Sequence, residues 1–225
     1  MYINSAYLNN SLVDFMDKSK PLIVGSCGTY HLYTHPRLPT YRPKGRLDFQ
    51  ILYVASGKAH FYFNDDGTDT VVHAGNMVVY RPKEPQKYEY FGIDQTEVYW
   101  VHFTGSDIKN MLRGYGITDE MHVINTGTSL EYTRIFKQMI LELQRHQSDY
   151  PEMLALLLRQ LLILIHRQLT TKNKIKNVYL DSEMEKAIQY FNDNYNTEIN
   201  IEEYAASRGM SVSWFIRCFK QFAST

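Results

Sequence analysis

The sequence predicts an α+β protein in which a β-rich N-terminal part is followed by helices. Between residues 21 and 103, apolar and polar side chains alternate in short runs, as expected for strands with one buried face. After residue 128, apolar side chains recur at helical spacing. A chain of 225 residues with 44% hydrophobic side chains is long enough to form one large or two small domains.

The predicted strands are short and lie close together. Alternation is clearest over residues 47–54, 58–63 and 97–103, and Ser56-Gly57 and Arg81-Pro82 are among the turn signals between the runs. Strands of this length and spacing are typical of a sandwich or small barrel. Residues 1 to about 20 are predicted to be a polar arm outside the strands.

Two helices are predicted next. Thr128-x-x-Glu131 is a capping box that opens a helix to about His146, and Asp149-x-x-Glu152 opens another to about Leu169. The centre of the second helix, residues 153–165, is apolar on nearly every side, so it needs burial on two faces. We expect one face to cover the strands and the other to contact a second subunit; the alternative is a helix buried within a monomer. The predicted dimer contacts are Leu154, Leu157, Leu158, Leu161 and Leu162.

The C-terminal segment has the pattern of a helix-turn-helix. After a polar linker over residues 172–179, Ser182 is predicted to cap a lead-in helix and Asn200 a second one. Gly209 suits the turn, and Ser211 caps a last helix whose inward side chains recur at i, i+3, i+4 and i+7. The alternative is an αα-hairpin that does not bind DNA. The inward residues are Phe215, Cys218, Phe219 and Phe222.

Motifs in both parts resemble AraC-type bacterial transcription regulators. The run from Ser211 to Lys220, SVSWFIRCFK, is similar to that family's first recognition helix. Arg42-Pro-x-Gly45 and Tyr99-Trp-Val-His-Phe103 are similar to its cupin-like sensor domain, and all occur in the family's order. The resemblance also rests on the run from Gln50 to Gly57, on Ala74-Gly75 and on Pro82-x-x-x-Gln86.

The resemblance implies a domain organisation. Residues 1–127 would form the arm and a cupin-like ligand-sensing barrel, 128–171 a helical dimerisation element, and 180–225 the first half of the DNA-binding domain. Members of the family continue into a second helix-turn-helix, and the sequence given ends at Thr225. We therefore expect this chain to bind an operator more weakly than one extended through the second motif.

The resemblance also implies a site for a small-molecule effector, with a carbohydrate as the expected class. Tyr88 and Trp100 match pocket residues of the arabinose-binding member, and core packing is the alternative for both. Ser56 and Val98 stand where that member has an arginine and a histidine, which argues against arabinose itself. Arginines near the site fit either polar contacts to the ligand or a solvated loop. The predicted ligand-binding residues are Tyr88, Trp100, Arg42, Arg46, Ser56 and His102.

On the last helix, the resemblance places base-reading residues at Ser213, Ile216 and Arg217, with Lys220 nearer the phosphates. Arginine reads guanine through paired hydrogen bonds. From Lys174 to Thr225 there are six basic and seven acidic residues, a net count of −1, which predicts weak non-specific binding to DNA. The expected partners are thus an effector, operator DNA and a second copy of the chain. The second hypothesis is a small-molecule-binding cupin dimer without productive DNA binding.

Enzymatic chemistry is not expected. A metal-binding cupin needs a His-x-His pair, but here His60 is followed by Tyr62, and no nucleophile motif or phosphate loop occurs. No catalytic residue, metal or cofactor is predicted. The two cysteines, Cys27 and Cys218, fit reduced thiols. With no signal-peptide pattern and no apolar run near the ~20 residues that a membrane span needs, we expect a cytoplasmic protein without a membrane partner.

Overall fold

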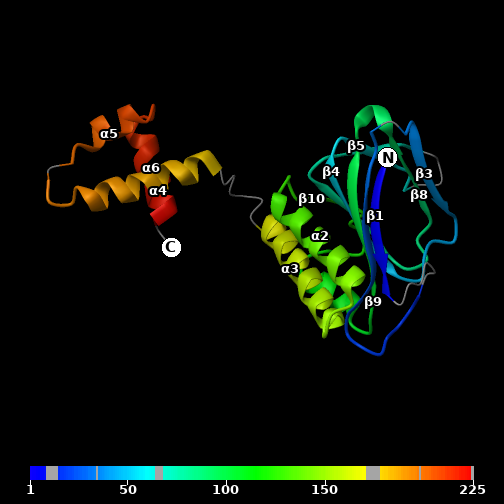
Figure 1. Ribbon diagram of the computed structural model, residues 1–225. Coiled ribbons are helices and arrows are strands. Elements are labelled where there is room, and N and C mark those ends of the chain that lie inside the picture. The colour runs from blue at the N-terminus through cyan, green and yellow to red at the C-terminus, as the bar shows by residue number, and fades with distance from the viewer. Residues whose placement is uncertain (9–14, 34, 64–67, 171–177, 198, 224–225) are drawn as a thin grey trace. The chain divides into compact units, whose positions relative to one another are not determined.

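The computed structural model describes residues 1–8, 15–33, 35–63, 68–170, 178–197 and 199–223 (Figure 1). The chain divides into two compact units, Met1–Thr170 and Thr171–Thr225. The predicted linker over 172–179 lies outside the described residues except for its last two, which open a helix.

The first unit contains two antiparallel sheets, which confirms the predicted β-rich domain. The six-stranded sheet has the order β1-β2-β9-β4-β7-β10, and the four-stranded sheet has the order β3-β8-β5-β6. In Figure 1 the helices α2 and α3 lie along one side of the larger sheet. The strands are β1 (Tyr2–Tyr7), β2 (Ile23–His31), β3 (Arg37–Arg42), β4 (Phe49–Ser56), β5 (Lys58–Phe61), β6 (Thr70–His73), β7 (Asn76–Tyr80), β8 (Gln86–Phe91), β9 (Glu97–Thr104) and β10 (Val123–Asn125).

Two stretches outside the predicted strands and helices contain regular structure. Within the predicted arm, Tyr2–Tyr7 forms strand β1, which pairs along its whole length with β2. Its hydrogen bonds come from main-chain groups, so weak side-chain patterning did not reveal it. Between residue 103, where the predicted strands end, and Thr128, where the next helix is predicted to begin, the structure contains helix α1 (Ile108–Gly114) and strand β10.

The larger sheet separates two apolar clusters. One lies between the two sheets and includes Leu52, Phe61 and Tyr90. The other lies between the larger sheet and helices α2 and α3, and includes Ile51 and Phe136. All six residues from Phe49 to Val54 in β4 are therefore buried, as expected for a strand covered on both faces.

Helix α2 spans Leu130–Arg145 and α3 spans Tyr150–Thr170. The N-cap of α2 is Ser129, one residue after the predicted Thr128, and its hydroxyl accepts a hydrogen bond from the Glu131 amide at 3.1 Å. The C-cap of α2 is His146, where the helix was predicted to end, and it adopts the left-handed conformation.

The five leucines of α3 that were assigned to a subunit contact lie in the chain's own core. Leu154, Leu158, Leu161 and Leu162 are fully buried and Leu157 is 7% exposed, all packed between α2 and the larger sheet. The prediction that these five leucines contact a second subunit is therefore wrong, because the chain's own sheet and α2 cover them. The apolar residues that α3 leaves exposed are Met153, Leu156 and Ile163.

Among the described residues, α3 alone is long and apolar enough to cross a membrane, by length and composition only. The 13-residue run identified in the sequence is the centre of this 21-residue helix. About 33% of its apolar segment is buried inside the protein, on the face that contributes to the core with α2 and the larger sheet.

The second unit consists of α4 (Val178–Asp193), α5 (Ile201–Ser207) and α6 (Val212–Ala223). Asn200 caps α5 by accepting hydrogen bonds from the amides of Glu202 and Glu203. Gly209 adopts the positive φ of 67° that the turn requires. Helix α4 begins four residues before the predicted cap, so Ser182 falls inside it. The shared core of the three helices contains Met184, Ala187, Tyr204, Ala205, Met210, Phe215 and Cys218.

Candidate functional site

A cavity of about 320 Å³ opens into the space between the two sheets of the first unit. Its size falls at the lower end of the range for small-molecule sites. Strands β1, β2, β3, β4, β8 and β9 all contribute side chains to it. Besides Arg46, which follows β3, the lining residues are Ile3, Tyr7, Ser26, Tyr30, Leu38, Thr40, Arg42, Gln50, Tyr88, Trp100 and His102.

The cavity brings together five of the six residues predicted to bind an effector. Ser56 is the exception, since it ends β4 whereas Gln50, near the start of that strand, lines the cavity. The Ser56 hydroxyl donates to the main-chain carbonyl of Gln95 at 3.2 Å. The five that line the cavity are Tyr88, Trp100, Arg42, Arg46 and His102.

Arg42 connects the cavity mouth to strand β8. Its Nη1 donates to Gln86 Oε1 at 2.9 Å and to Tyr88 OH at 3.3 Å, because β3 and β8 pair with Arg42 opposite Gln86. The guanidinium is thus held by neutral groups. Arg37, on the same strand, instead pairs with Glu89 outside the cavity.

The second arginine belongs to an ionic group. Arg46 donates two hydrogen bonds to Asp48, Nε to Oδ1 at 2.7 Å and a terminal nitrogen to Oδ2 at 2.9 Å. Asp48 is 1% exposed, and its Oδ1 also lies 3.2 Å from His102 Nδ1. This arrangement balances the charge of Arg46 with that of Asp48.

Burial raises the pKa of Asp48, but the hydrogen bonds from Arg46 and His102 outweigh it, and the net pKa lies below the usual value. Burial lowers the pKa of His102 below its usual value, although its contact with Asp48 acts in the opposite direction. Near neutral pH, Asp48 is therefore ionised and His102 is neutral. An ionised Asp48 can only accept, so His102 donates from Nδ1 and presents Nε2 as an acceptor.

Several polar atoms between the sheets form no hydrogen bond with a described residue. The Trp100 and Tyr30 rings lie 6.1 Å apart between centroids, and the Trp100 indole nitrogen is buried without a hydrogen-bond partner among the described residues. A buried polar group without a partner costs about 1–3 kcal/mol, so a molecule that pairs with such atoms is bound favourably. The unpaired atoms here are Gln50 Oε1, Tyr80 OH, Gln86 Nε2, Tyr90 OH and Trp100 Nε1.

The position of Trp100 depends on a residue that sequence reasoning missed. Gly28 of β2 pairs directly with Trp100 of β9, and a Cβ added at Gly28 would lie 2.5 Å from Trp100 Cζ2. A glycine in the middle of a strand often marks such a close approach, so a signal was present. Gln50 and Tyr30 were also missed, because nothing in the linear pattern shows which strand faces line a cavity.

On α6, the four residues predicted to contact DNA are exposed. Ser213, Ile216, Arg217 and Lys220 lie at i, i+3, i+4 and i+7, which is one face of the helix. The opposite face carries Phe215, which is 2% exposed, with Phe219 and Phe222 partly buried beside it. Trp214, at the border of the two faces, is half-buried.

The residues described by the structure contain no group of three or more His, Cys, Asp or Glu placed to hold a metal ion. His60, the single histidine of the incomplete pair, has its Nδ1 2.7 Å from Asp69 Oδ2.

Two sheets enclosing a polar, aromatic-lined cavity define the first unit as a cupin-like ligand-binding domain. A sequence model described as the AraC-like ligand binding domain matches residues 26–162. The chain belongs to this family. No curated protein sequence matches the chain.

Solved structures that are similar to the chain are so at low sequence identity and low TM-score. Unsaturated fatty acid-bound ToxT from Vibrio cholerae strain SCE256 is 12% identical, with 94% of this chain and 95% of that chain covered and a TM-score of 0.39. An apo ToxT variant from the same strain is 13% identical, with 93% and 96% covered and a TM-score of 0.42. YhaK from Escherichia coli is 10% identical, with 46% and 45% covered and a TM-score of 0.33.

Proposed function

We propose that this protein is a ligand-responsive transcription regulator. The cavity between the sheets binds a small polar molecule, a carbohydrate in the first instance, and the α5–α6 helix-turn-helix binds operator DNA in the cytoplasm. One observation supports the ligand most directly: unpaired buried polar atoms lie beside aromatic rings in an AraC-like ligand-binding domain. No enzymatic activity is proposed.

A carbohydrate suits this site because it has both apolar ring faces and hydroxyl groups. Trp100 and Tyr88 offer ring surfaces, and the indole nitrogen is a donor for a hydroxyl. Gln50 Oε1 and His102 Nε2 are acceptors for hydroxyl hydrogens. Since Asp48 balances Arg46 and His102 is neutral, Arg42 leaves one positive charge at the mouth, which also suits a sugar acid.

Isothermal titration with neutral monosaccharides and with uronic acids tests the ligand. We expect saturable binding to at least one sugar, weakened by ~1–3 kcal/mol in Trp100→Ala, the contribution of burying one large side chain. The matched control is Trp214→Ala, because Trp214 is the other tryptophan and belongs to the second unit. If Trp100→Ala binds the sugar like the wild type, the site assignment is wrong.

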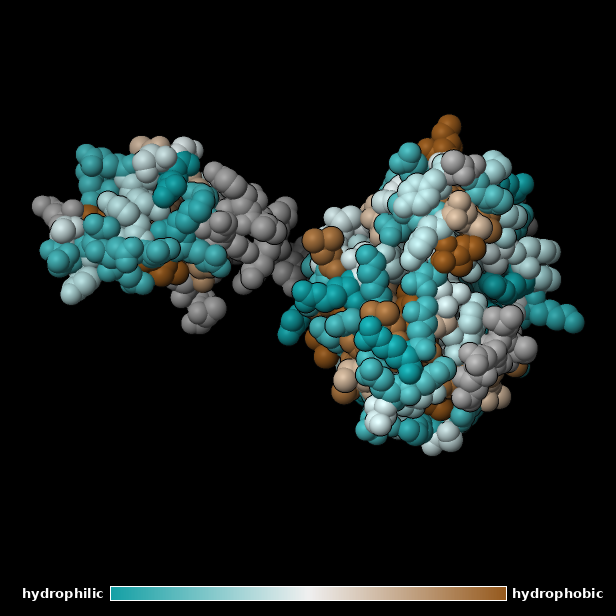
Figure 2. Space-filling model, viewed as in Figure 1, coloured by the Kyte–Doolittle hydropathy of each residue, from teal (hydrophilic) through white to brown (hydrophobic). Residues whose placement is uncertain are grey.

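Homodimerisation through α3 is part of the proposal, at a surface different from that expected from sequence. Met153, Leu156 and Ile163 are 45%, 61% and 39% exposed. Their spacing of three and seven residues places them on one face, and Figure 2 shows apolar side chains at the surface over α2 and α3. A contact between two such faces removes this apolar surface from water.

A binding module without productive DNA contact remains the second candidate. The net count of −1 between Lys174 and Thr225 favours it, because phosphate neutralisation supplies most non-specific affinity. Gel-shift titration of candidate operators at several salt concentrations separates the two. Affinity for DNA that falls steeply with added salt supports DNA binding. If DNA is not shifted even at low salt, the binding module without DNA contact is supported.

A further inference from the structure

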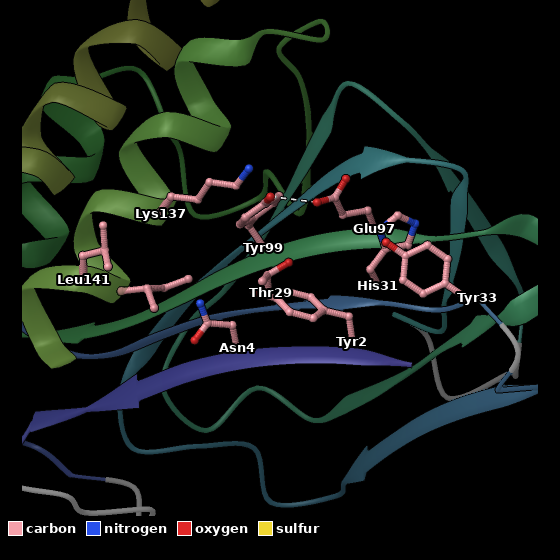
Figure 3. A pocket seen from close by; sticks show the side chains of 10 residues that line it. Tyr2, Asn4, Thr29, His31, Tyr33, Glu97, Tyr99, Lys137 and Leu141 are labelled. Atoms are coloured by element: carbon pink, nitrogen blue, oxygen red, sulfur yellow. Dashed lines mark hydrogen bonds between the residues drawn. The ribbon is translucent and has the colours of Figure 1, made fainter.

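A second hollow, of about 440 Å³, lies on the opposite face of the larger sheet, where α2 crosses it (Figure 3). Its floor consists of the neighbouring strands β1, β2 and β9, and α2 forms one wall through Lys137, Ile140 and Leu141. We call this hollow the α2 groove. It is separate from the cavity between the sheets, because successive side chains of a strand point to opposite faces.

The strand register arranges the floor as two rows of side chains. Asn4 pairs with Thr29 and Thr29 with Tyr99, which gives the first row. Tyr2, His31 and Glu97 form the second row in the same way. Side chains that pair across antiparallel strands lie about 5 Å apart, so the six residues form one compact patch.

The groove contains one carboxylate and one ammonium group, and neither forms an ion pair with a side chain of the described residues. Glu97 accepts a hydrogen bond from Tyr99 OH at 2.7 Å, and no cationic side chain of the described residues pairs with it. Burial raises the pKa of Tyr99, and the bond to Glu97 raises it further, so the phenol stays protonated and donates. Lys137, across the groove on α2, makes no hydrogen bond or ion pair within the described chain. Figure 3 shows the Tyr99 hydroxyl between these two charged groups.

A buried hydroxyl in the floor also has no partner. Thr29 is 4% exposed, and its Oγ1 forms no hydrogen bond although it lies beside Tyr99. In the same row, Asn4 Oδ1 accepts from Gln144 Nε2 at 2.8 Å, which leaves the Asn4 Nδ2 hydrogens for another acceptor. The groove thus combines a carboxylate, an ammonium group, a buried hydroxyl and, on α2, two aliphatic side chains.

We propose that the α2 groove binds a small zwitterion of the amino-acid class. The ligand's ammonium group pairs with Glu97 and donates to Thr29 Oγ1. Its carboxylate pairs with Lys137, and its side chain contacts Ile140 and Leu141, which lie one turn along α2 from Lys137. A ligand with a single charge would leave either Glu97 or Lys137 without its partner.

Titration calorimetry of the whole chain tests the ligand class. L-leucine, L-methionine and L-phenylalanine are the probes, with L-leucinamide and N-acetyl-L-leucine as derivatives that each lack one charge. We expect saturable binding of at least one amino acid, and at least about tenfold weaker binding when either charge is removed from it. Absence of saturable heat with all three, or equal binding of the derivatives, overturns the proposal.

Two substitutions connect the affinity to the proposed contacts. Glu97→Gln retains an acceptor for Tyr99 and Lys137→Met retains the aliphatic stem, so each removes one charge with little change in shape. We expect each to lower amino-acid affinity at least about tenfold. Lys137→Met should bind L-leucine and L-leucinamide equally, because the charge that distinguishes them is gone. Glu97→Gln should still bind L-leucine more tightly than L-leucinamide.

Matched controls show whether the effect is local. Glu131→Gln and Lys109→Met change the same residue types at exposed helical positions outside the groove. Arg42→Gln alters only the cavity between the sheets, so it should leave amino-acid binding unchanged, while Glu97→Gln should leave sugar binding unchanged. If the controls weaken amino-acid binding as much as the groove variants do, or if Lys137→Met still rejects the amide, the proposal is overturned.

Discussion

Gly28 and Trp100 face each other across the β2–β9 pair, and the indole occupies the space that a Cβ at Gly28 would need. The φ of Gly28 is not in the left-handed region, so the constraint is one of space rather than of backbone conformation. The sheet therefore positions the tryptophan of the proposed effector site through the absence of a side chain on the neighbouring strand.

Gly28→Ala should displace the Trp100 ring and destabilise the first unit by ~1–3 kcal/mol, the usual cost of overpacking. Tryptophan fluorescence in a Trp214→Phe background reports on Trp100 alone, and urea titration gives the stability. Gly114→Ala is the control, because a Cβ at that position would meet nothing within 4 Å beyond its chain neighbours and the nearby backbone of its own helix. Unchanged emission and stability in Gly28→Ala would show that the ring relaxes without cost.

His102 should make stability depend on pH. Its pKa in the folded state lies below the usual 6.5, so the unfolded chain takes up its proton first as the pH falls. The stabilisation is complete above about pH 6.5 and is lost as the pH falls toward the folded-state pKa. Urea titrations between about pH 8 and pH 5 should show a smaller loss in His102→Gln than in the wild type. An equal loss of stability with falling pH in His102→Gln and in the wild type would contradict this role of His102.

Asp48 should make the stability of the first unit depend on pH in a lower range than His102 does. Its pKa in the folded state lies below the usual 3.8, so its contribution is present above that value and is lost as the pH falls through the folded-state pKa. Asp48→Asn should therefore be most destabilising near neutral pH, where it removes the ionised carboxylate that pairs with Arg46. A destabilisation by Asp48→Asn that does not diminish at acidic pH would show that the carboxylate charge is not responsible.

The two faces of α3 should respond differently to substitution. Leu161→Ala removes a fully buried side chain and should lower the free energy of unfolding by about 2–5 kcal/mol. Leu156 is 61% exposed, so Leu156→Lys should change the stability of the subunit little but convert dimers to monomers. Sedimentation at one fixed concentration measures the oligomeric state. Dimers that persist in Leu156→Lys would exclude this surface as the contact.

Arg217→Ala should lower affinity for a natural operator by ~1–3 kcal/mol and relax the preference for one base, as expected for an arginine that reads guanine. Lys186→Ala is a suitable control, because Lys186 belongs to α4 and pairs with Glu183 at 2.6 Å. Gel-shift titration at fixed salt compares the two. An equal effect of both substitutions would indicate a general electrostatic contribution rather than base reading.

Much of the fold could be predicted because its signals are local. Alternation identified the strands of the first unit, and caps and apolar spacing identified α2, α3 and the helix-turn-helix. Where the structure differs, the missing information was tertiary. Strand β1 depends on main-chain pairing with β2. The N-cap of α2 is Ser129 instead of the predicted Thr128.

The sequence by itself determined the fold class, the family resemblance and five of the residues that line the cavity. Tertiary structure alone decided which face of α3 remains exposed, because an apolar helix does not show whether a sheet or a second subunit covers each side. It also decided that Ser56 lies away from the cavity, and that residues 4, 29, 97, 99 and 137 meet in the α2 groove. Register and packing bring together side chains that are distant in the chain, and no local pattern records those contacts.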